Sequence, residues 1–334
     1  MLMKKFLLTI AVVMTAFSAT AQTKNYTDNL VVSIMGQSTD PQEATIAVTQ
    51  AANGTYTLSL NNFMLGGAVA VGNIVVDGIE ATETNGIKSF EASRKINITA
   101  GEGNEEWIGP MLGEVPVNLI GKMDDEKLYC SININMQEAE VGTIKVTFGD
   151  RKVFVEKTAT YTDNLVVKID GEETEPQQTT IIVDTNKDNT YTLSLNNFVL
   201  GKILPVGDII VENITPSVNG KIANFTTSRS ILITAGTGLE GETEWLGPNL
   251  GEVPINLVGK KDAENLYCTI DIDMSEMLGQ TITVVFGEES KVTSIGNISV
   301  ENGAKVIYDI TGRRVNAITA PGIYIVNGKK TIIK

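Results

Sequence analysis

Four pairs of acidic residues are the side chains whose type best suits acid–base chemistry. They recur at matching positions in two halves of the chain: Asp28 and Asp163, Glu106 and Glu244, Glu114 and Glu252, and Glu126 and Glu264. Glycoside hydrolysis needs two carboxylates about 5 to 9.5 Å apart. Nothing in the spacing along the sequence brings any pair together. We therefore predict that the protein is not an enzyme, with a carbohydrate-active enzyme as the third hypothesis.

The absence of histidine removes further mechanisms. It excludes Ser-His-Asp triads, Cys-His dyads and the commonest zinc and iron sites. Residues 184–189 begin like a calcium loop but lack the glycine at the sixth position and the distal glutamate. We predict a hairpin turn there, and neither a metal ion nor a cofactor anywhere in the protein.

The two cysteines occupy equivalent places, Cys130 in Leu-Tyr-Cys-Ser-Ile and Cys268 in Leu-Tyr-Cys-Thr-Ile. Equivalent positions in separate domains rarely meet, so a disulfide bond is not expected. The prediction is two thiols buried in separate cores.

A duplicated segment organises the chain. Residues 56–63, Tyr-Thr-Leu-Ser-Leu-Asn-Asn-Phe, recur unchanged at 191–198, 135 residues later. A three-residue insertion after Ala235 then moves the offset to 138, and residues 107–122 match 245–260 at twelve of sixteen positions. Self-similarity on this scale indicates tandem domains. We predict domains at 22–150 and 161–290, joined by a linker at 151–160.

Alternation of apolar and polar residues predicts that both domains are all-β. Leu30, Val32 and Ile34 stay apolar in the second copy, whereas Ser33 becomes Lys168, which is the pattern of a half-buried strand. The same comparison gives eight short strands per copy, separated by turn signals and without a sustained helical period. Eight antiparallel strands joined in sequence favour a closed up-and-down barrel, which leaves no edge strand, over a sandwich.

Three motifs carry a family resemblance. They are Gly109-Pro-Met-Leu-Gly-Glu-Val-Pro-Val-Asn-Leu119, the following Leu128-Tyr-Cys-Ser-Ile-Asn-Ile, and Thr143-Ile-Lys-Val-Thr-Phe-Gly149. With them, nearly all of each copy resembles the calycin-like β-barrel domain of secreted proteins from Bacteroidota. The resemblance implies two lipocalin-like barrels and no settled activity.

One arginine per copy falls on the inward face of a predicted strand, Arg94 in the first and Arg229 in the second. A buried guanidinium must be paired or stacked. Its candidate partners are Trp107 and Trp245, by stacking, and Glu114 and Glu252, by accepting hydrogen bonds. We favour a structural plug at one end of each barrel. The alternative is an arginine that anchors a carboxylate-bearing ligand, such as a fatty acid, in the lumen.

Two other features are candidate ligand contacts. Asn62 and Asn197 extend an inward face to a strand end, where capping of backbone groups is favoured over ligand contact. The loop at 101–114 and its longer counterpart at 236–252 carry the only two tryptophans. Such loops often take part in recognition, but a tryptophan tucked under the barrel is the favoured interpretation.

The N-terminus predicts export across the inner membrane. Lys4 and Lys5 precede an apolar run, and the small residues Ala19 and Ala21 precede a cleavage site before Gln22, so residues 1–21 are predicted to be a signal peptide. The run of about a dozen residues is shorter than the ~20 needed to span a bilayer, and no later stretch approaches that length. No transmembrane segment is predicted.

The C-terminal residues 291–334 are a separate tail. Residues 306–315 and 321–334 indicate a few small strands, and they resemble the sorting domain of type nine secretion substrates. The resemblance implies that export machinery recognises the tail and that the protein is secreted or attached to the outer-membrane surface, with the periplasm as fallback. A small retained β module is the alternative.

Charge excludes one class of partner. Residues 22–290 hold 17 basic and 38 acidic side chains, while the tail holds seven basic and two acidic ones. A body this acidic repels phosphate backbones, so no nucleic-acid partner is predicted.

The leading functional hypothesis is an exported, non-enzymatic binding protein in which each barrel holds a small hydrophobic or amphipathic ligand. The alternative is a structural or adhesive cell-surface protein whose barrels are filled by their own side chains and whose outer faces meet a surface or host macromolecule. The large inward residues Tyr56, Phe90, Met136 and Phe148 favour a filled core.

Overall fold

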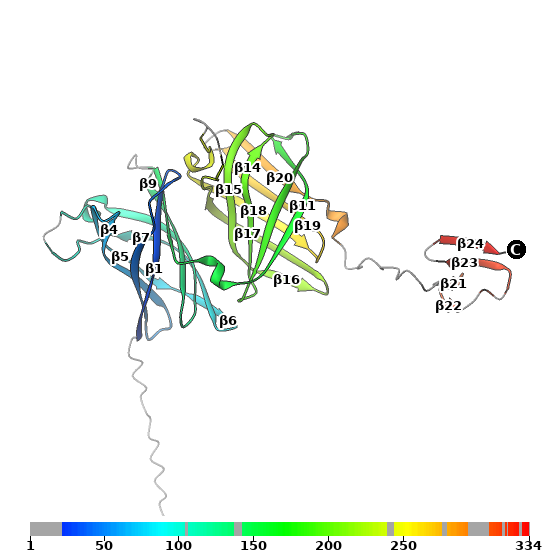
Figure 1. Ribbon diagram of the computed structural model, residues 1–334, viewed down its shortest axis with the longest axis horizontal. Coiled ribbons are helices and arrows are strands. Elements are labelled where there is room, and N and C mark those ends of the chain that lie inside the picture. Colours follow the sequence, from blue (N-terminus) through cyan, green and yellow to red (C-terminus); the bar gives the residue numbers. More distant parts are fainter. Residues whose placement is uncertain are drawn as a thin grey trace, which may run out of the picture. The chain divides into compact units, whose positions relative to one another are not determined.

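The computed structural model describes residues 22–103, 106–136, 142–238, 244–275, 279–292, 307–315, 318, 320–326 and 329–333. The predicted signal peptide, residues 1–21, lies outside the described residues. The chain divides after Val292 into two compact units, the first containing both repeats and the second the tail (Figure 1). No described helix is long and apolar enough to cross a membrane.

The first repeat forms one curled antiparallel sheet, here called barrel 1. Its strands are β1 (Gln22–Ile34), β2 (Gln37–Ser38), β3 (Gln42–Gln50), β4 (Tyr56–Leu65), β5 (Val69–Ile79), β6 (Ala81–Thr84), β7 (Ile87–Asn97), β8 (Glu114–Met123), β9 (Leu128–Met136) and β10 (Gly142–Phe148). Their order is β5-β4-β3-β1-β10-β9-β8-β7-β6, with β2 paired to β1. β1 joins the two halves because it pairs with β3 along its first part and with β10 from Leu30 onward.

The second repeat, barrel 2, has the same topology. Its strands are β11 (Val155–Ile169), β12 (Glu172–Glu173), β13 (Gln177–Asn186), β14 (Tyr191–Leu200), β15 (Leu204–Ile214), β16 (Pro216–Asn219), β17 (Ile222–Leu232), β18 (Glu252–Lys261), β19 (Leu266–Met274) and β20 (Gln280–Phe286). Their order repeats that of barrel 1. The prediction of two tandem all-β domains, each with eight main strands, is confirmed.

The linker is shorter than predicted. A 3₁₀ turn, η3 (Arg151–Phe154), is followed at once by β11. The side chain of Asp150 caps η3 by accepting the backbone N–H of Lys152 at 2.8 Å. Residues 155–160, expected in the linker, belong to β11 because they pair with β13 and lengthen that ladder.

Each sheet curls without full closure, which differs from the expected closed barrel. In barrel 1, β6 pairs with the start of β7, and a single bridge between Asn73 and Thr99 joins β5 to the chain just after β7. Between these two points β5 and β7 separate, which leaves a seam. The bridge requires glycine at position 72, where a Cβ would come within 2.2 Å of the Thr99 carbonyl oxygen. Barrel 2 has the same bridge, between Asp208 and Thr234.

The inward faces of the strands form the two cores. Barrel 1 buries an apolar cluster that includes Leu30, Leu119 and Phe148, each with no exposed surface. Barrel 2 buries the corresponding set around Leu165 and Leu257. Burial of one such side chain contributes about 1.5 to 3 kcal/mol, so these faces supply the main stabilisation of each sheet.

Both cysteines are buried free thiols, one in each core. Burial raises the pKa of Cys268 to about 12, and it raises the pKa of Cys130 as well. Because the thiolate is the reactive form, we expect neither thiol to react with Ellman's reagent at pH 8 in the native protein, and both to react in denaturant. Reaction of one thiol without denaturant would contradict this and would show that its barrel opens.

The tail forms its own small sheet. Its strands are β21 (Ile307–Asp309), β22 (Arg314–Val315), β23 (Gly322–Val326) and β24 (Lys329–Ile333), in the order β22-β21-β23-β24 and antiparallel throughout. The Asp309 carboxylate accepts the backbone N–H groups of Thr311 and Arg313 and so closes the turn between β21 and β22. The expected small C-terminal β tail is present.

Candidate functional site

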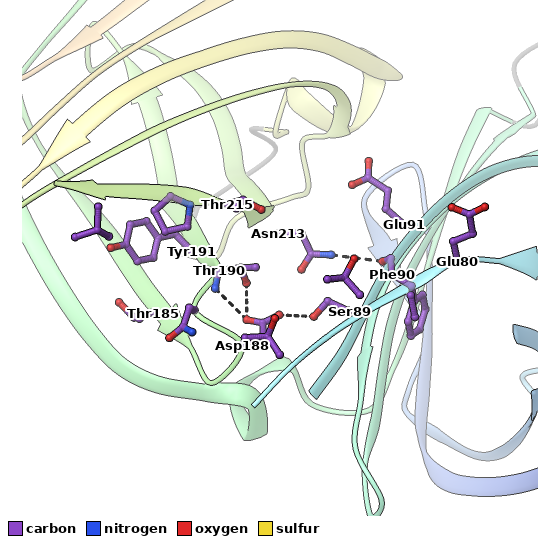
Figure 2. A pocket seen from close by; sticks show the side chains of 16 residues that line it. Glu80, Ser89, Phe90, Glu91, Thr185, Asp188, Thr190, Tyr191, Asn213 and Thr215 are labelled. Atoms are coloured by element: carbon purple, nitrogen blue, oxygen red, sulfur yellow. Dashed lines mark hydrogen bonds between the residues drawn. The ribbon is translucent and has the colours of Figure 1, made fainter. Parts of the chain in front are cut away.

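A groove with a volume of about 930 Å³ lies between the two barrels (Figure 2). This volume falls within the 300 to 1,000 Å³ or so that is usual for ligand pockets. β6 and β7 form the wall from barrel 1, and the β13–β14 turn with the chain around β16 forms the wall from barrel 2. The lining hydroxyl groups include those of Thr82, Thr84, Thr185 and Thr215, the amides belong to Asn189 and Asn213, and the carboxylates belong to Glu80, Glu91 and Asp188.

The groove can form hydrogen bonds in both directions. β6 and β16 are the last strands of their sheets, so each also has a backbone edge outside the ladders. Hydroxyl and amide groups both donate and accept, whereas the two glutamates accept only. Glu91 is paired with Arg229, so Glu80 gives the groove its negative character, which favours a neutral or cationic polar ligand over an anionic one.

A buried ion pair joins the barrels beside this groove. The Lys122 ammonium of β8 contacts the carboxylate of Asp188, in the β13–β14 turn, and donates a hydrogen bond to Thr190 Oγ1 at 2.9 Å. The Asp188 carboxylate also accepts hydrogen bonds from Ser89 of β7 and from the Thr190 hydroxyl, as Figure 2 shows. The side chains of Lys122 and Asp188 are only 1% and 2% exposed.

The surroundings of Asp188 determine its charge. Burial alone would raise the pKa of this carboxyl, but the hydrogen bonds and charge of Lys122, with the hydrogen bonds from Ser89 and Thr190, outweigh that effect and lower the pKa. The carboxylate is therefore ionised at neutral pH. Because its pKa is lower in the folded than in the unfolded chain, its contribution to stability is full above pH ~4 and is lost as the pH falls further.

A second buried contact also joins the two barrels. Tyr129 of β9 donates its hydroxyl hydrogen to Glu212 of β15 at 2.8 Å, and both side chains are buried. Burial and then the Glu212 carboxylate raise the pKa of Tyr129. Phe154 of η3 is fully buried against Ile87 and Tyr129. Apolar packing by the linker thus adjoins the polar contacts between the barrels.

The linker is also anchored to barrel 2. The Asp184 carboxylate of β13, which has no exposed surface, accepts hydrogen bonds from Arg151 at 2.9 Å, Lys152 at 2.8 Å and Thr158 at 2.6 Å. Burial alone would raise the pKa of Asp184, but these hydrogen bonds and the charge of Arg151 lower it. The cations of η3 therefore hold the linker against barrel 2 at neutral pH.

The arginines predicted to plug the barrels lie elsewhere. Arg94 occupies a position on β7 that alternation assigns to the inward face, yet its side chain is exposed. Its guanidinium donates hydrogen bonds to the carbonyl oxygens of Gly78 at 2.9 Å and Ser93 at 3.0 Å. Its guanidinium crosses the seam, where the separation of β5 and β7 leaves carbonyl groups free. The prediction of a buried Arg94 is therefore wrong. Arg229 crosses the seam of barrel 2 to the Glu212 carbonyl at 2.8 Å and also pairs with Glu91 of barrel 1 at 3.3 Å.

The tryptophans and asparagines hold the long loops instead. The Trp107 ring lies so close to Gly101 that a Cβ there would approach it within 2.5 Å, and Trp245 lies over Gly236 in the same way. Asn62 Oδ1 accepts the backbone N–H of Glu102 at 2.7 Å. Asn197 Oδ1 accepts that of Thr237 at 2.6 Å. Both asparagine side chains therefore cap backbone N–H groups, which is the interpretation favoured above over ligand contact.

The two glutamates predicted as arginine partners have different surroundings. Glu114 is exposed, whereas Glu252 accepts a hydrogen bond from Asn118 of barrel 1. Near Glu252, a second groove of about 680 Å³ lies between residues 34–39 of barrel 1 and the Trp245 loop of barrel 2. Contact there is close, because a Cβ on Gly36 would come within 2.7 Å of Pro248. Trp245 and Glu252 thus lie at the junction of the barrels.

The lumen of barrel 1 contains little free space. Its cavity has a volume of about 40 Å³ and is lined almost entirely by apolar side chains such as Leu58, Phe63 and Val117. This is far below the roughly 300 Å³ at which ligand pockets begin. The side chains of barrel 1 therefore fill their own core.

The segment that begins like a calcium loop forms the turn between β13 and β14, as predicted, closed by a hydrogen bond from Asn186 N–H to the Thr190 carbonyl at 2.8 Å. Its two acidic side chains, Asp184 and Asp188, bind lysine and arginine groups instead. Within the described ranges, no group of three or more His, Cys, Asp or Glu side chains is arranged to hold a metal ion.

The contacts between the barrels were not predicted. The available signal was the difference between the copies rather than their likeness: Asp188 stands where the first copy has Asn53, Asp184 where it has Thr49, and Met35 where the second copy has Asp170. Charges and apolar residues that appear in one copy alone indicate surfaces on which that copy has a partner of its own.

Comparison with known proteins gives one match. A family model described as a calycin-like beta-barrel domain matches residues 23–150 and again residues 158–289. Neither a curated protein nor a solved structure matches the chain significantly. The two matched segments coincide closely with barrel 1 and barrel 2.

Proposed function

Because the chain belongs to the calycin-like β-barrel domain family, we propose that it is a non-enzymatic binding protein whose ligand lies between the barrels. The observation that carries this proposal is the difference in volume between the groove and the lumen of barrel 1. The groove between the barrels has a volume of about 930 Å³, whereas the lumen cavity of barrel 1 has about 40 Å³. Only the first is large enough for an ordinary ligand.

The chemistry of the groove fits a hydroxyl-bearing ligand such as a short oligosaccharide. Threonine hydroxyls come from both walls and asparagine amides from the barrel 2 wall, so a ligand that spans the groove meets donors and acceptors on each side. Glu80 can accept hydrogen bonds from sugar hydroxyl groups and disfavours anionic sugars, while Glu91 is paired with Arg229. Pro216 and Val218, the latter 65% exposed, add a small apolar surface at one side.

Removal of one hydroxyl from each wall tests this proposal. We expect Thr82→Val and Thr185→Val each to weaken oligosaccharide binding about 3- to 10-fold, because each removes a hydrogen bond worth about 0.5 to 1.5 kcal/mol while nearly keeping the side-chain volume. A glycan array identifies the ligand and isothermal titration calorimetry measures the change. Thr27→Val, on the exposed face of β1, is the matched control. Equal affinities in all three variants would place the ligand elsewhere.

A small hydrophobic or amphipathic ligand would instead bind in the lumen of a barrel. In barrel 1 such a ligand would have to open the filled core. Native mass spectrometry of protein purified from its own host separates the hypotheses. A retained lipid mass would favour the lumen. Absence of both lipid and glycan binding would favour the structural or adhesive hypothesis, in which the outer faces contact a surface or host macromolecule.

Export is part of the proposal. The predicted signal peptide at 1–21 and the small β tail support secretion or attachment to the outer-membrane surface. Recovery of the protein from medium and cell-surface fractions, with mass spectrometry of both chain ends, tests the location and the removal of either segment. Recovery from the cytoplasm alone with both ends intact would refute export.

A further inference from the structure

We propose that the outer face of barrel 2 around Lys260 and Tyr267 is a docking surface for the acidic hairpin turn of a calycin-like domain in another protein. The proposal is independent of the ligand groove. It rests on the contact between barrel 1 and barrel 2, which shows what the equivalent face of barrel 1 binds.

On barrel 1, that face receives the β13–β14 turn of barrel 2. Lys122 and Ser89 bind the Asp188 carboxylate at the tip of the turn, and Tyr129 binds Glu212 beside it. The recognised feature is a hairpin turn with one buried carboxylate. The aspartate accepts the N–H and the hydroxyl of Thr190 at 3.1 and 2.7 Å, so the turn itself holds the carboxylate in place.

Barrel 2 keeps the main parts of this face. With the offset of 138 residues, Lys260 corresponds to Lys122 and Tyr267 to Tyr129. Both line a groove of about 370 Å³, together with Phe225 and the hydroxyl groups of Thr226 and Ser217. Val258 also lines this groove and is 46% exposed, which leaves apolar surface beside the cation.

Lys260, the cation in this groove, is paired with an exposed carboxylate of its own barrel. Lys260 pairs with Glu289 of the 3₁₀ turn η5 (Glu289–Lys291) at 3.2 Å, and the Glu289 side chain is 67% exposed. An exposed pair of this kind contributes little, so an incoming carboxylate can displace it. In barrel 1 the corresponding residue is Arg151, which binds Asp184 and leaves Lys122 to Asp188.

The free hairpin turn of a second copy of this chain lacks the required charge, because its Asp188 turn is already bound to Lys122. The turn of barrel 1 that would enter the groove carries Asn53, which accepts the N–H and hydroxyl of Thr55 at 3.1 and 2.8 Å, as Asp188 does with Thr190. The geometry is the same, but the carboxylate is missing. Beside it, Asp77 is exposed at the position that corresponds to Glu212. The occupant is therefore a domain that has an aspartate at the turn.

The substitution Asn53→Asp turns this difference into an experiment on the full chain. It supplies the carboxylate without changing the turn, so the barrel 1 turn of one molecule acquires the feature that the barrel 2 face of the next should bind. A head-to-tail contact of this kind uses two different surfaces of each molecule, so molecules should join in series as rings or open chains. Sedimentation velocity between about 1 and 200 µM should show wild-type monomers and a mass for Asn53→Asp that rises several-fold with concentration.

The double variant Asn53→Asp/Lys260→Met should return to a monomer, which ties association to this face and excludes an effect of the turn charge elsewhere. Monomeric Asn53→Asp at every concentration would overturn the proposed surface. Lys260-dependent association of the wild type would overturn the proposed occupant, because a neutral turn of a second copy would then suffice.

Discussion

Replacing Asp188 with alanine is expected to weaken the docked arrangement of the two barrels by about 3 to 5 kcal/mol at pH 7, because it leaves Lys122 as a buried charge without its partner. The cost includes the lost hydrogen bonds to Ser89 and Thr190. Urea titration followed by circular dichroism, together with the rate of trypsin cleavage at Arg151 and Lys152, measures the loss. The linker should be cleaved faster because separation of the barrels exposes it.

The matched control for Asp188→Ala is the same kind of pair in the other barrel. Lys260→Met should cost less than about 1 kcal/mol, since Lys260 pairs with an exposed Glu289. The double variant Lys122→Met/Asp188→Leu should recover most of the stability, because it removes both charges together. A small effect of Asp188→Ala and a larger effect of Lys260→Met would contradict the assignment of Lys122 and Asp188 as the pair that joins the barrels.

The same pair predicts a pH dependence. The pKa of Asp188 is lower in the folded chain, so the wild type should lose docking stability as the pH falls below ~4, and Asp188→Ala should lack this part of the dependence. Asp184, whose pKa is also lowered, should contribute in the same direction, so the variant will keep some acid sensitivity.

The strands could be predicted from the sequence because duplication made each inward face visible twice. Leu30, Val32 and Phe148 are buried as their alternation indicated. Arg94 lies on the same face of its strand by alternation, and its predicted burial was wrong. Alternation gives the face of a strand, but it does not show whether the neighbouring strand is present to cover it. At the seam the neighbouring strand is separated, so the guanidinium reaches the Gly78 carbonyl and solvent.

The candidate site could not be predicted in the same way, because it is formed between copies. Asp188 and Asn53 make the same turn, and a comparison that looks for likeness treats them as equivalent. The charge of Asp188 has a role only because barrel 1 places Lys122 opposite it, and no periodicity within one domain contains that information. Differences between copies are therefore the better guide to this interface.

Phe154 should be the most important apolar residue of the linker. It is fully buried against Ile87 and Tyr129, at the place where the chain leaves barrel 1 and starts β11. Phe154→Ala is expected to cost about 3 to 5 kcal/mol, because it removes a whole buried ring and leaves a cavity beneath the junction. Urea titration measures this free energy. Phe154→Leu, which keeps most of the volume, should cost clearly less.

Val292, the residue of barrel 2 that corresponds to Phe154, is the control that distinguishes an effect on the contact between the barrels from an effect on local packing. It follows η5 as Phe154 ends η3, it is 3% exposed, and the described chain places no further barrel beyond it. Val292→Ala should cost about 2 kcal/mol, the loss of two buried methyl groups, and should leave the rate of trypsin cleavage at Arg151 and Lys152 unchanged. Phe154→Ala should accelerate that cleavage. If both variants left it unchanged, the polar contacts of Lys122 and Tyr129 would be sufficient to hold the barrels together, and the linker would only connect them.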